Sequence, residues 1–237
     1  MRVNLPRRTL LFISAGTALL PLLARAQTPL KVGVIGSGHI GGTVGSLWVK
    51  AGHPVLFSSR HPEALAGMVQ DLGPLAHAGT PAEAVAFGDV VFVAVPYGAL
   101  PQIGRDLGPA LAGKVVLDAC NAVASRDGET ATVAKDKGIG LASAAYLPGT
   151  KLVRGFNTLG YRILQSEAHR GGEPLAIPIA GDDPAAVQSV AGLVRDAGFV
   201  PVVVGPLAKA SEFAMGAPGY GQNVGAQDLK AKLGLAQ

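Results

Sequence analysis

Short apolar runs alternate with segments of helical periodicity along most of the chain. The apolar runs predict buried strands at residues 31–35, 55–57, 89–95, 115–117, 175–180 and 200–204. Helices are predicted up to residue 51 and at 62–71, 81–87, 99–111, 159–169, 184–198 and 207–215, with weaker helical signals at 132–134 and 142–147. This alternation is typical of an α/β fold with a doubly wound, mostly parallel sheet and helices on both faces.

Local signals at helix ends support these boundaries. Thr80 and Glu83 have the spacing of a capping box, with Pro81 at the first helical position. Asp183 stands directly before Pro184, and an aspartate followed by proline predicts the start of another helix. The boundaries divide the chain into a core at 30–122, an α/β part at 123–215 that completes the sheet and the substrate side, and a loose glycine-rich tail at 216–237.

The first 26 residues differ in composition from the rest of the chain. Arg2 and the pair Arg7-Arg8 give a basic start, an apolar stretch follows, and residues 24–26 read Ala-Arg-Ala. This order predicts a cleavable signal peptide, with Gln27 first after cleavage. The arginine pair indicates the twin-arginine pathway, with Sec as the alternative, and thus a periplasmic or secreted protein. A buried N-terminal helix is disfavoured because the segment has no acid and no amphipathic period.

Charge and cysteine usage narrow the classes of partner. The segment 1–26 contains four of the 20 basic residues and none of the 16 acidic ones, so the mature chain is close to neutral. The mature chain therefore has no basic patch that would predict binding to nucleic acid. No transmembrane segment is predicted after the signal peptide. Homo-oligomerisation is possible on this sequence. The single cysteine, Cys120, cannot form an internal disulfide. The five histidines lack metal-ligand spacing, so no metal site is predicted.

A Gly-x-Gly-x-x-Gly sequence connects the first predicted strand to the first predicted helix. Its residues are Gly36, Ser37, Gly38, His39, Ile40 and Gly41. The first glycine permits a tight turn, the second lets the backbone approach a pyrophosphate, and the third allows close helix–strand packing. Unpaired N–H groups at the positive end of the helix dipole would hold the phosphates. The motif predicts a dinucleotide site in a Rossmann-type fold. The alternative for the motif is a glycine-rich turn that binds no ligand. The alternative for His39 is a solvent-facing residue at the start of the helix.

The end of the second predicted strand indicates which dinucleotide binds. Domains that bind NAD place an acidic residue there for the ribose hydroxyls, whereas this chain has Ser58, Ser59 and Arg60. A carboxylate would repel a 2′-phosphate, but hydroxyls and a guanidinium would bind it through charge-assisted hydrogen bonds. We therefore predict NADP(H), with Ser59 and Arg60 as the main ligands. The alternative is a solvated arginine in a loop.

Two further segments follow buried strands and are expected at the same edge of the sheet. The first is Ala94, Val95, Pro96 and Tyr97, and the second is Asn121 and Ala122. Ligands of open α/β sheets bind outside the carboxyl ends of the strands, so this backbone is predicted to line the nicotinamide ribose. Ordinary strand-end turns are the alternative for both segments.

Together these residues resemble the NADPH-dependent coenzyme F420 reductase family. The resemblance extends from Lys31 to about Met215 and rests on V-G-V-I-G-S-G-H-I-G, F-S-S-R, F-V-A-V-P-Y, R-G-F-N-T-L, P-I-A-G-D-D and V-V-V-G-P-L in this order. Similar domains occur in membrane ferric reductases that pass hydride from NADPH to flavin. The resemblance implies hydride transfer between NADP(H) and a deazaflavin, coenzyme F420, or a flavin-like acceptor.

The same resemblance implies how the reaction proceeds. The two rings stack and hydride moves directly, so no catalytic acid or base is needed and the protein supplies alignment and exclusion of water. Asn157 and Thr158 would lie beside the reacting rings. The alternative for Asn157 is an N-cap of the helix that begins at Leu159.

Two other functions are alternatives to this one. A reductase of the pyrroline-carboxylate or 6-phosphogluconate type needs a long helical dimer domain, whereas the residues after Leu152 still alternate strands and helices. A non-catalytic exported NADP-binding module or sensor is the second. The lack of a catalytic side chain does not separate such a module from an enzyme that transfers hydride directly.

Overall fold

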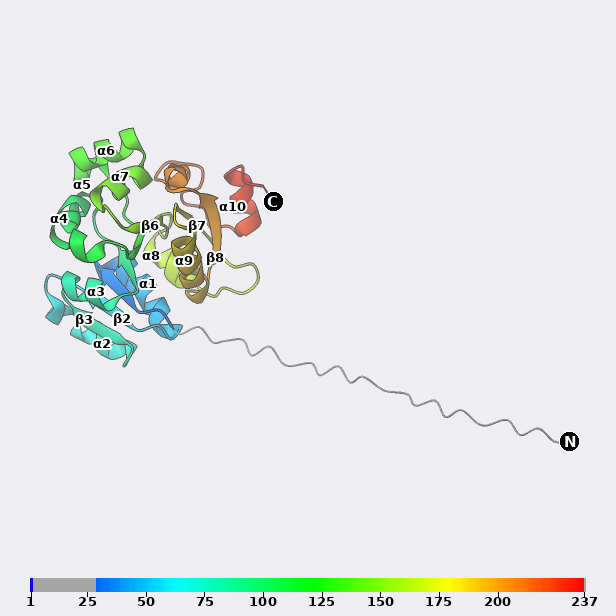
Figure 1. Ribbon diagram of the computed structural model, residues 1–237, viewed down its shortest axis with the longest axis horizontal. Coiled ribbons are helices and arrows are strands. Elements are labelled where there is room, and N and C mark those ends of the chain that lie inside the picture. Colours follow the sequence, from blue (N-terminus) through cyan, green and yellow to red (C-terminus); the bar gives the residue numbers. More distant parts are fainter. Residues whose placement is uncertain (2–28, 237) are drawn as a thin grey trace.

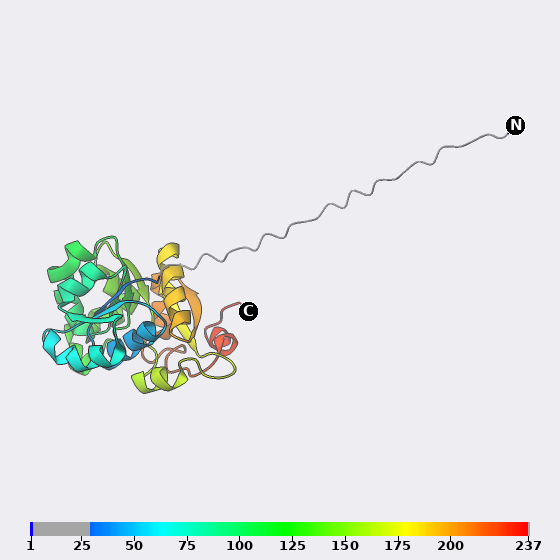
Figure 2. The same ribbon diagram turned by 90° about the horizontal axis from the view of Figure 1, so that it is seen from below.

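A computed structural model describes residue 1 and residues 29–236 of the chain (Figure 1). The predicted signal peptide, residues 1–26, therefore lies almost wholly outside the described residues. The described part forms one sheet with helices on both faces (Figures 1 and 2). This arrangement confirms the predicted Rossmann-type α/β fold.

The sheet has eight strands in the order β3-β2-β1-β4-β5-β6-β7-β8. The strands are β1 Val32–Ile35, β2 Val55–Ser58, β3 Ala76–Gly79, β4 Val90–Val93, β5 Val115–Asp118, β6 Lys151–Arg154, β7 Ala176–Gly181 and β8 Val200–Gly205. β1 to β6 are parallel, β7 is antiparallel to β6, and β8 is parallel to β7. The strand order reverses between β1 and β4, and ligands of open α/β sheets bind at the carboxyl ends beside such a switch.

The helices cover both faces of this sheet. The α-helices are α1 His39–Lys50, α2 Ala66–Leu72, α3 Pro81–Phe87, α4 Leu100–Leu111, α5 Ala124–Asp127, α6 Glu129–Lys137, α7 Ile139–Tyr146, α8 Tyr161–Glu167, α9 Pro184–Asp196 and α10 Ala226–Lys232. Short 3₁₀ helices occur at η1 Pro62–Leu65, η2 Tyr97–Ala99 and η3 Leu207–Phe213.

Alternating strand positions divide the core between the two faces of the sheet. In β4, Phe92 belongs to the cluster that includes side chains of α1, α8 and α9, whereas Val91 and Val93 belong to the cluster with α4, α7 and η3. Because both faces are covered, the strands are apolar nearly throughout, which is the pattern the sequence shows.

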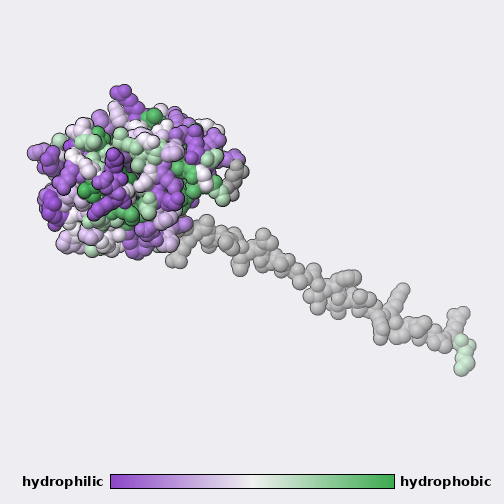
Figure 3. All heavy atoms as spheres, turned by 90° about the horizontal axis from the view of Figure 1, so that it is seen from above, coloured by the Kyte–Doolittle hydropathy of each residue, from purple (hydrophilic) through white to green (hydrophobic). Residues whose placement is uncertain are grey.

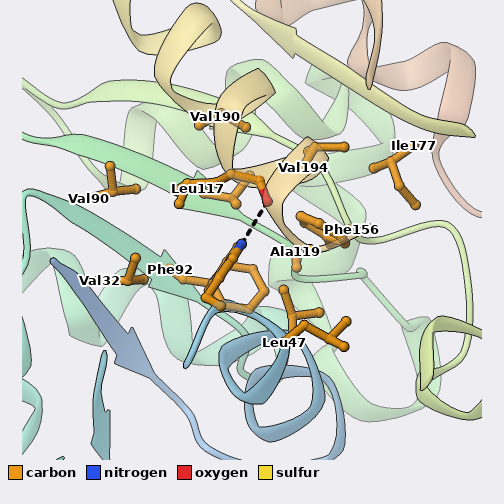
Figure 4. Packing of buried hydrophobic residues seen from close by; sticks show 14 of the residues in the cluster. Val32, Leu47, Val90, Phe92, Leu117, Ala119, Phe156, Ile177, Val190 and Val194 are labelled. Carbon is orange, nitrogen blue, oxygen red and sulfur yellow. Dashed lines mark hydrogen bonds between the residues drawn. The ribbon is translucent and has the colours of Figure 1, made fainter. Parts of the chain in front are cut away.

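Trp48 fixes helix α1 against the first of these faces. Its fully buried ring meets Phe92 and Phe156 edge-on, with centroid separations of 5.0 and 5.9 Å. Its Nε1 donates a hydrogen bond of 2.8 Å to the Leu193 carbonyl of α9. Figure 4 shows this cluster, with Phe156 close to Val194 of α9 and to Ala119, and Leu47 of α1 on the side away from Val190. The last turn of α1, the helix that begins at the glycine motif, is thereby anchored to the core.

Three segments differ from the sequence predictions in detail. Strand β3 was not predicted because it is short, lacks β-branched residues and exposes His77 and Ala78 at the sheet edge. The predicted helix at 62–71 begins as the 3₁₀ turn η1 and continues as α2. The predicted helix at 207–215 is the 3₁₀ helix η3.

The predicted loose tail at 216–237 is wrong for the described residues 216–236. Helix α10 lies in this segment, and its Leu229 is fully buried beside Ala176 of β7 and Val202 of β8. The Val224 carbonyl accepts a hydrogen bond of 2.9 Å from the Ala176 N–H. The high glycine content concealed this packing, because a single buried leucine gives no periodic signal.

The surface of the described part is mixed in polarity. Figure 3 shows hydrophilic side chains interspersed with smaller apolar areas on one face. Four large apolar side chains within residues 29–236 are exposed, each in a different part of the fold: Leu141, Ile163, Val203 and Met215. No helix of residues 29–236 is long and apolar enough to cross a membrane.

Candidate functional site

The glycine loop between β1 and α1 has the geometry that its sequence predicts. Gly36 has a φ of +94°, and a Cβ there would lie 2.6 Å from the Ala94 carbonyl oxygen. A Cβ on Gly41 would lie 2.0 Å from the Gly36 carbonyl oxygen. A Cβ on Gly38 would meet nothing within 4 Å, so this glycine faces open space. The first and third glycines are required by packing, and the second leaves room for a ligand at the backbone.

The start of α1 presents unpaired hydrogen-bond donors to that open space. Gly38 is the N-cap, no side chain caps the helix, and the first turn contains no acidic residue. The N–H groups of His39, Ile40 and Gly41 lack intrahelical acceptors, as in every first turn. With the positive end of the helix dipole, they form a site suited to a pyrophosphate.

The tip of β2 lies beside the glycine loop. The Ser37 N–H and hydroxyl donate to the Ser58 carbonyl over 3.3 and 3.1 Å. Ser58 is only 1% exposed, so its hydroxyl is not accessible to a nucleotide. Its backbone carbonyl instead holds the glycine loop through Ser37. Ser59 is half-buried and its hydroxyl accepts a hydrogen bond of 3.0 Å from the His61 N–H, while Arg60 is exposed. Ser59 and Arg60 therefore remain the side chains available to a 2′-phosphate.

The loops after β4 and β5 lie on neighbouring parallel strands, as predicted. Residues 94–96 are half-buried or exposed, but the Tyr97 side chain points into the core. Its hydroxyl donates to the Ile139 carbonyl over 3.3 Å and accepts from Ser143 over 3.2 Å, and burial raises its pKa. Tyr97 can therefore meet a ligand only through its backbone.

A buried ion pair beneath these loops was not predicted from the sequence. Arg154 of β6 and Asp118 of β5 are fully buried and bonded to each other. Arg154 Nη2 donates to the Cys120 carbonyl over 2.7 Å, and Asp118 Oδ1 accepts from the Cys120 N–H over 2.8 Å. The pair thus fixes the peptide groups on both sides of Cys120, the residue before Asn121. The Cys120 thiol is buried with them, and burial raises its pKa well above the usual value.

A second unpredicted carboxylate joins the two loops directly. Asp127 Oδ1 accepts from the Gly98 N–H over 3.1 Å, and Oδ2 accepts from the Val123 N–H over 2.8 Å. The Arg126 guanidinium also bonds this carboxylate and donates to the Asn121 carbonyl over 2.7 Å. We call this set the Asp127 bridge. In the sequence, the only sign of the Asp127 bridge is an aspartate shortly after the loop that follows the buried strand β5.

The Asp127 bridge predicts a loss of stability in acid. The hydrogen bond from Arg126, with those from Val123 and Gly98, lowers the pKa of Asp127 from 3.8 to about 2. Because the folded-state pKa is below the unfolded value, the ionised carboxylate stabilises the fold above about pH 4. This contribution, about 2 kcal/mol, is lost as the pH falls towards 2. Urea unfolding of the wild type and Asp127→Asn should show a free-energy difference that shrinks over this range, and a constant difference would contradict the assignment.

The loop after β6 brings Asn157 beside Asn121. Asn121 Nδ2 donates to the Asn157 carbonyl over 2.6 Å, and Asn157 Nδ2 donates to the Phe213 carbonyl over 3.1 Å. Asn157 and Thr158 are both 2% exposed. Helix α8 begins only at Tyr161, after an N-cap at Gly160 with no side-chain bond, so the alternative that Asn157 caps this helix is wrong.

Two cavities adjoin these loops. One of about 630 Å³ lies between α1, α2 and α8, and at its mouth His39 stacks on Tyr161 with centroids 4.3 Å apart. His39 is therefore exposed but not free of contacts. The other, of about 270 Å³, begins at the loop after β5 and reaches α6, α7 and the end of η3. Its lining residues are Asn121, Ala122, Ala124, Ala131, Ala134, Lys135, Ile139, Ala214 and Met215. Residues 29–236 contain no group of His, Cys, Asp or Glu that could hold a metal ion.

Residues 31–122, which contain the glycine loop, the β2 tip and both neighbouring loops, match the family described as NADP oxidoreductase coenzyme F420-dependent. Over these residues the chain is similar to that family. The matched segment comprises β1 to β5 with their connecting helices. The family supports NADP(H) as the cofactor and oxidation–reduction as the class of chemistry.

Known proteins resemble the chain beyond residues 31–122. Metalloreductase STEAP3 of Rattus norvegicus is 30% identical over 185 residues, which are 77% of this chain and 35% of that protein. The chain thus spans about a third of the length of this curated relative. The structure of the hypothetical protein SMa0349 from Sinorhizobium meliloti has a TM-score of 0.69 at 26% identity, covering 83% of this chain and 95% of that one. A proposed F420-dependent NADP reductase from Arthrobacter sp. FB24 has a TM-score of 0.63 at 23% identity, covering 77% and 87%.

Proposed function

We propose that the chain transfers hydride between NADP(H) and a deazaflavin (coenzyme F420) or flavin acceptor. The observation that carries the proposal is the pairing of an open glycine loop with an exposed Arg60 where NAD-binding domains place an acid. The pyrophosphate would meet the N–H groups of residues 39–41. The 2′-phosphate would meet Ser59 and Arg60, and the nicotinamide would lie over the loops after β4 and β5.

The residues around the nicotinamide position suit direct hydride transfer. Residues 94–96 and Asn121 follow β4 and β5 and are half-buried or exposed, whereas the Asp118–Arg154 pair beside them is fully buried. Direct transfer needs two rings in close parallel contact and no proton donor. The contribution of the protein is therefore to hold the rings and exclude water.

The 270 Å³ cavity is the acceptor position that we propose. It begins at Asn121 and Ala122, so a ring inside it would lie next to a nicotinamide over the same loop. Its walls are mostly alanine with Ile139 and Met215, which suits a flat apolar ring, and Lys135 gives it a positive charge. Asn157 lies behind Asn121, within its hydrogen-bond network.

The proposal predicts NADPH oxidation that depends on the acceptor. Purified protein should oxidise NADPH when F420, FMN or riboflavin is supplied, as followed by the near-ultraviolet absorbance of NADPH. Lys135→Glu should raise the KM of the anionic acceptors F420 and FMN roughly fivefold and leave that of riboflavin unchanged. Lys137→Glu, on the same helix but outside the cavity lining, is the matched control. Tight NADPH binding without oxidation by any acceptor would favour the non-catalytic module.

A ferric chelate is a further acceptor to include, because the curated relative is named a metalloreductase. A metal ion takes one electron at a time, whereas NADPH gives two as hydride. Reduction of iron would therefore require added flavin as the intermediate carrier.

Export is part of the proposal. The basic start and the Ala-Arg-Ala sequence at 24–26 support a signal peptide, and the arginine pair supports the twin-arginine pathway. This pathway carries folded proteins, so the protein could leave the cytoplasm with its nucleotide bound. Sequencing the N-terminus of the exported protein, which should begin near Gln27, tests this point.

A further inference from the structure

The loops after β4 and β5 are held at a fixed separation by one carboxylate. Gly98 belongs to the loop after β4, and Val123 belongs to the loop after β5. Each loop donates a backbone N–H to a different oxygen of Asp127, over 3.1 and 2.8 Å. The Asp127 side chain is 1% exposed, so water does not compete for these two bonds.

Asp127 also lies close to the Cα of Gly98 in the first loop. A Cβ on Gly98 would lie 3.2 Å from Asp127 Oδ1 and 3.5 Å from Asp127 Cα. A side chain at this position would therefore require the carboxylate to shift by a few tenths of an ångström. Glycine at 98 and aspartate at 127 form a matched pair, although they are 29 residues apart in the chain.

Arg126 extends the same connection to the residue that would face the ligand. Its guanidinium bonds both Asp127 oxygens and donates to the Asn121 carbonyl over 2.7 Å. The side chain of Asn121 lines the 270 Å³ cavity and bonds the Asn157 carbonyl. The bridge thus reaches from the loop after β4 to the wall of the proposed acceptor position.

We infer that Asp127 is a positioning residue that sets the geometry of the nicotinamide half of the site. The inference rests on the proposed function, in which both loops line the nicotinamide ribose. Hydride transfer requires the reacting atoms within a narrow range of distance, and a displacement of about 1 Å can lower the rate on the order of a hundredfold. Asp127 would not touch the nucleotide and would act through the two peptide groups that it holds.

The chemistry of the bridge requires a carboxylate. Both partners of Asp127 in the loops are N–H donors, so both of its side-chain termini must accept. An asparagine presents one acceptor and one NH₂ donor. It would therefore face one loop N–H with another donor, and that loop would move away from the bridge.

The test compares two ligands that differ only in their nicotinamide half. Calorimetry with Asp127→Asn should show NADPH affinity lowered on the order of tenfold, with the affinity for adenosine 2′-phosphate 5′-diphosphate unchanged, because this fragment lacks both the nicotinamide and its ribose. In turnover with FMN, kcat should fall more than the KM of FMN rises. A role in folding alone would lower the affinity for both ligands together or for neither.

Asp183→Ala is the matched control. Asp183 is also a carboxylate that accepts a backbone N–H, from Ala186 over 2.8 Å, but it caps α9 at the opposite edge of the sheet. This variant should lose stability without loss of NADPH affinity. If Asp127→Asn does not fold, Gly98→Ala shifts the same carboxylate slightly and should give a smaller loss that is selective in the same way.

The outcomes separate the inference from the proposed function. Wild-type protein that binds neither NADPH nor the fragment contradicts the proposed function. Wild-type protein that binds both, with Asp127→Asn and Gly98→Ala equal to it in NADPH affinity and kcat, overturns the positioning role and leaves the proposed function standing.

Discussion

Replacing Arg60 by alanine is expected to lower the affinity for NADPH about 30-fold and to leave the affinity for NADH nearly unchanged. Arg60 is exposed at the tip of β2, beside a glycine loop open enough for a pyrophosphate. A charge-assisted hydrogen bond to a 2′-phosphate contributes about 2 kcal/mol, which corresponds to this ratio. NADH lacks the phosphate, so the loss should be specific to NADPH. Titration calorimetry of the wild type and the variant with each nucleotide measures it.

Arg105→Ala is the control for the change in net charge. Arg105 lies on the exposed face of α4 and donates to Gln102 over 2.6 Å, outside the nucleotide loops. It should leave both affinities unchanged. Equal losses for NADPH and NADH in Arg60→Ala would show that the guanidinium contacts a part common to both nucleotides, and the assignment to the 2′-phosphate would be lost.

The largest expected loss of stability comes from Arg154→Met. The substitution leaves the fully buried Asp118 carboxylate without its cation, and removing one partner of a buried ion pair costs about 3–5 kcal/mol. Urea denaturation should show this decrease in the free energy of unfolding. Phe156 and the rest of the apolar core are untouched, so the slope of the transition should stay the same.

The double variant Asp118→Asn with Arg154→Met tests the cause of that loss. Asparagine has no charge to leave unpaired, and its side-chain oxygen can still accept from the Cys120 N–H. The double variant should therefore be more stable than Arg154→Met alone. If it were less stable, the loss would come from the volume of the arginine and not from the buried charge.

The parts of the fold that follow from local signals were predicted from the sequence. The glycine loop and the start of α9 at Asp183 depend on residues within a few positions of one another, and both were predicted correctly. The capping box at Thr80 is present for the same reason, with both reciprocal hydrogen bonds. The strand pattern was readable because covered strands are apolar at nearly every position.

The parts that depend on distant contacts were not predictable. Asp118 and Arg154 meet across 36 positions, and Asp127 reaches Gly98 across 29, so spacing along the chain gives no sign of either contact. Helix α10 packs against β7 and β8 through Leu229, its one fully buried residue, with Ala226 and Leu233 partly buried beside it. The orientation of Tyr97 into the core likewise depends on α7, which comes about 40 residues later.

Because Cys120 is buried, the reactivity of its thiol can be used to measure local opening of the fold. Its thiol is 1% exposed and is surrounded by the peptide groups that Asp118 and Arg154 hold, so a thiol reagent can reach it only when this region opens. As the sole cysteine, it would give a single labelling signal. The rate of alkylation would then measure how often the loop after β5 opens, and slower alkylation with nucleotide added would measure how far the ligand suppresses that opening.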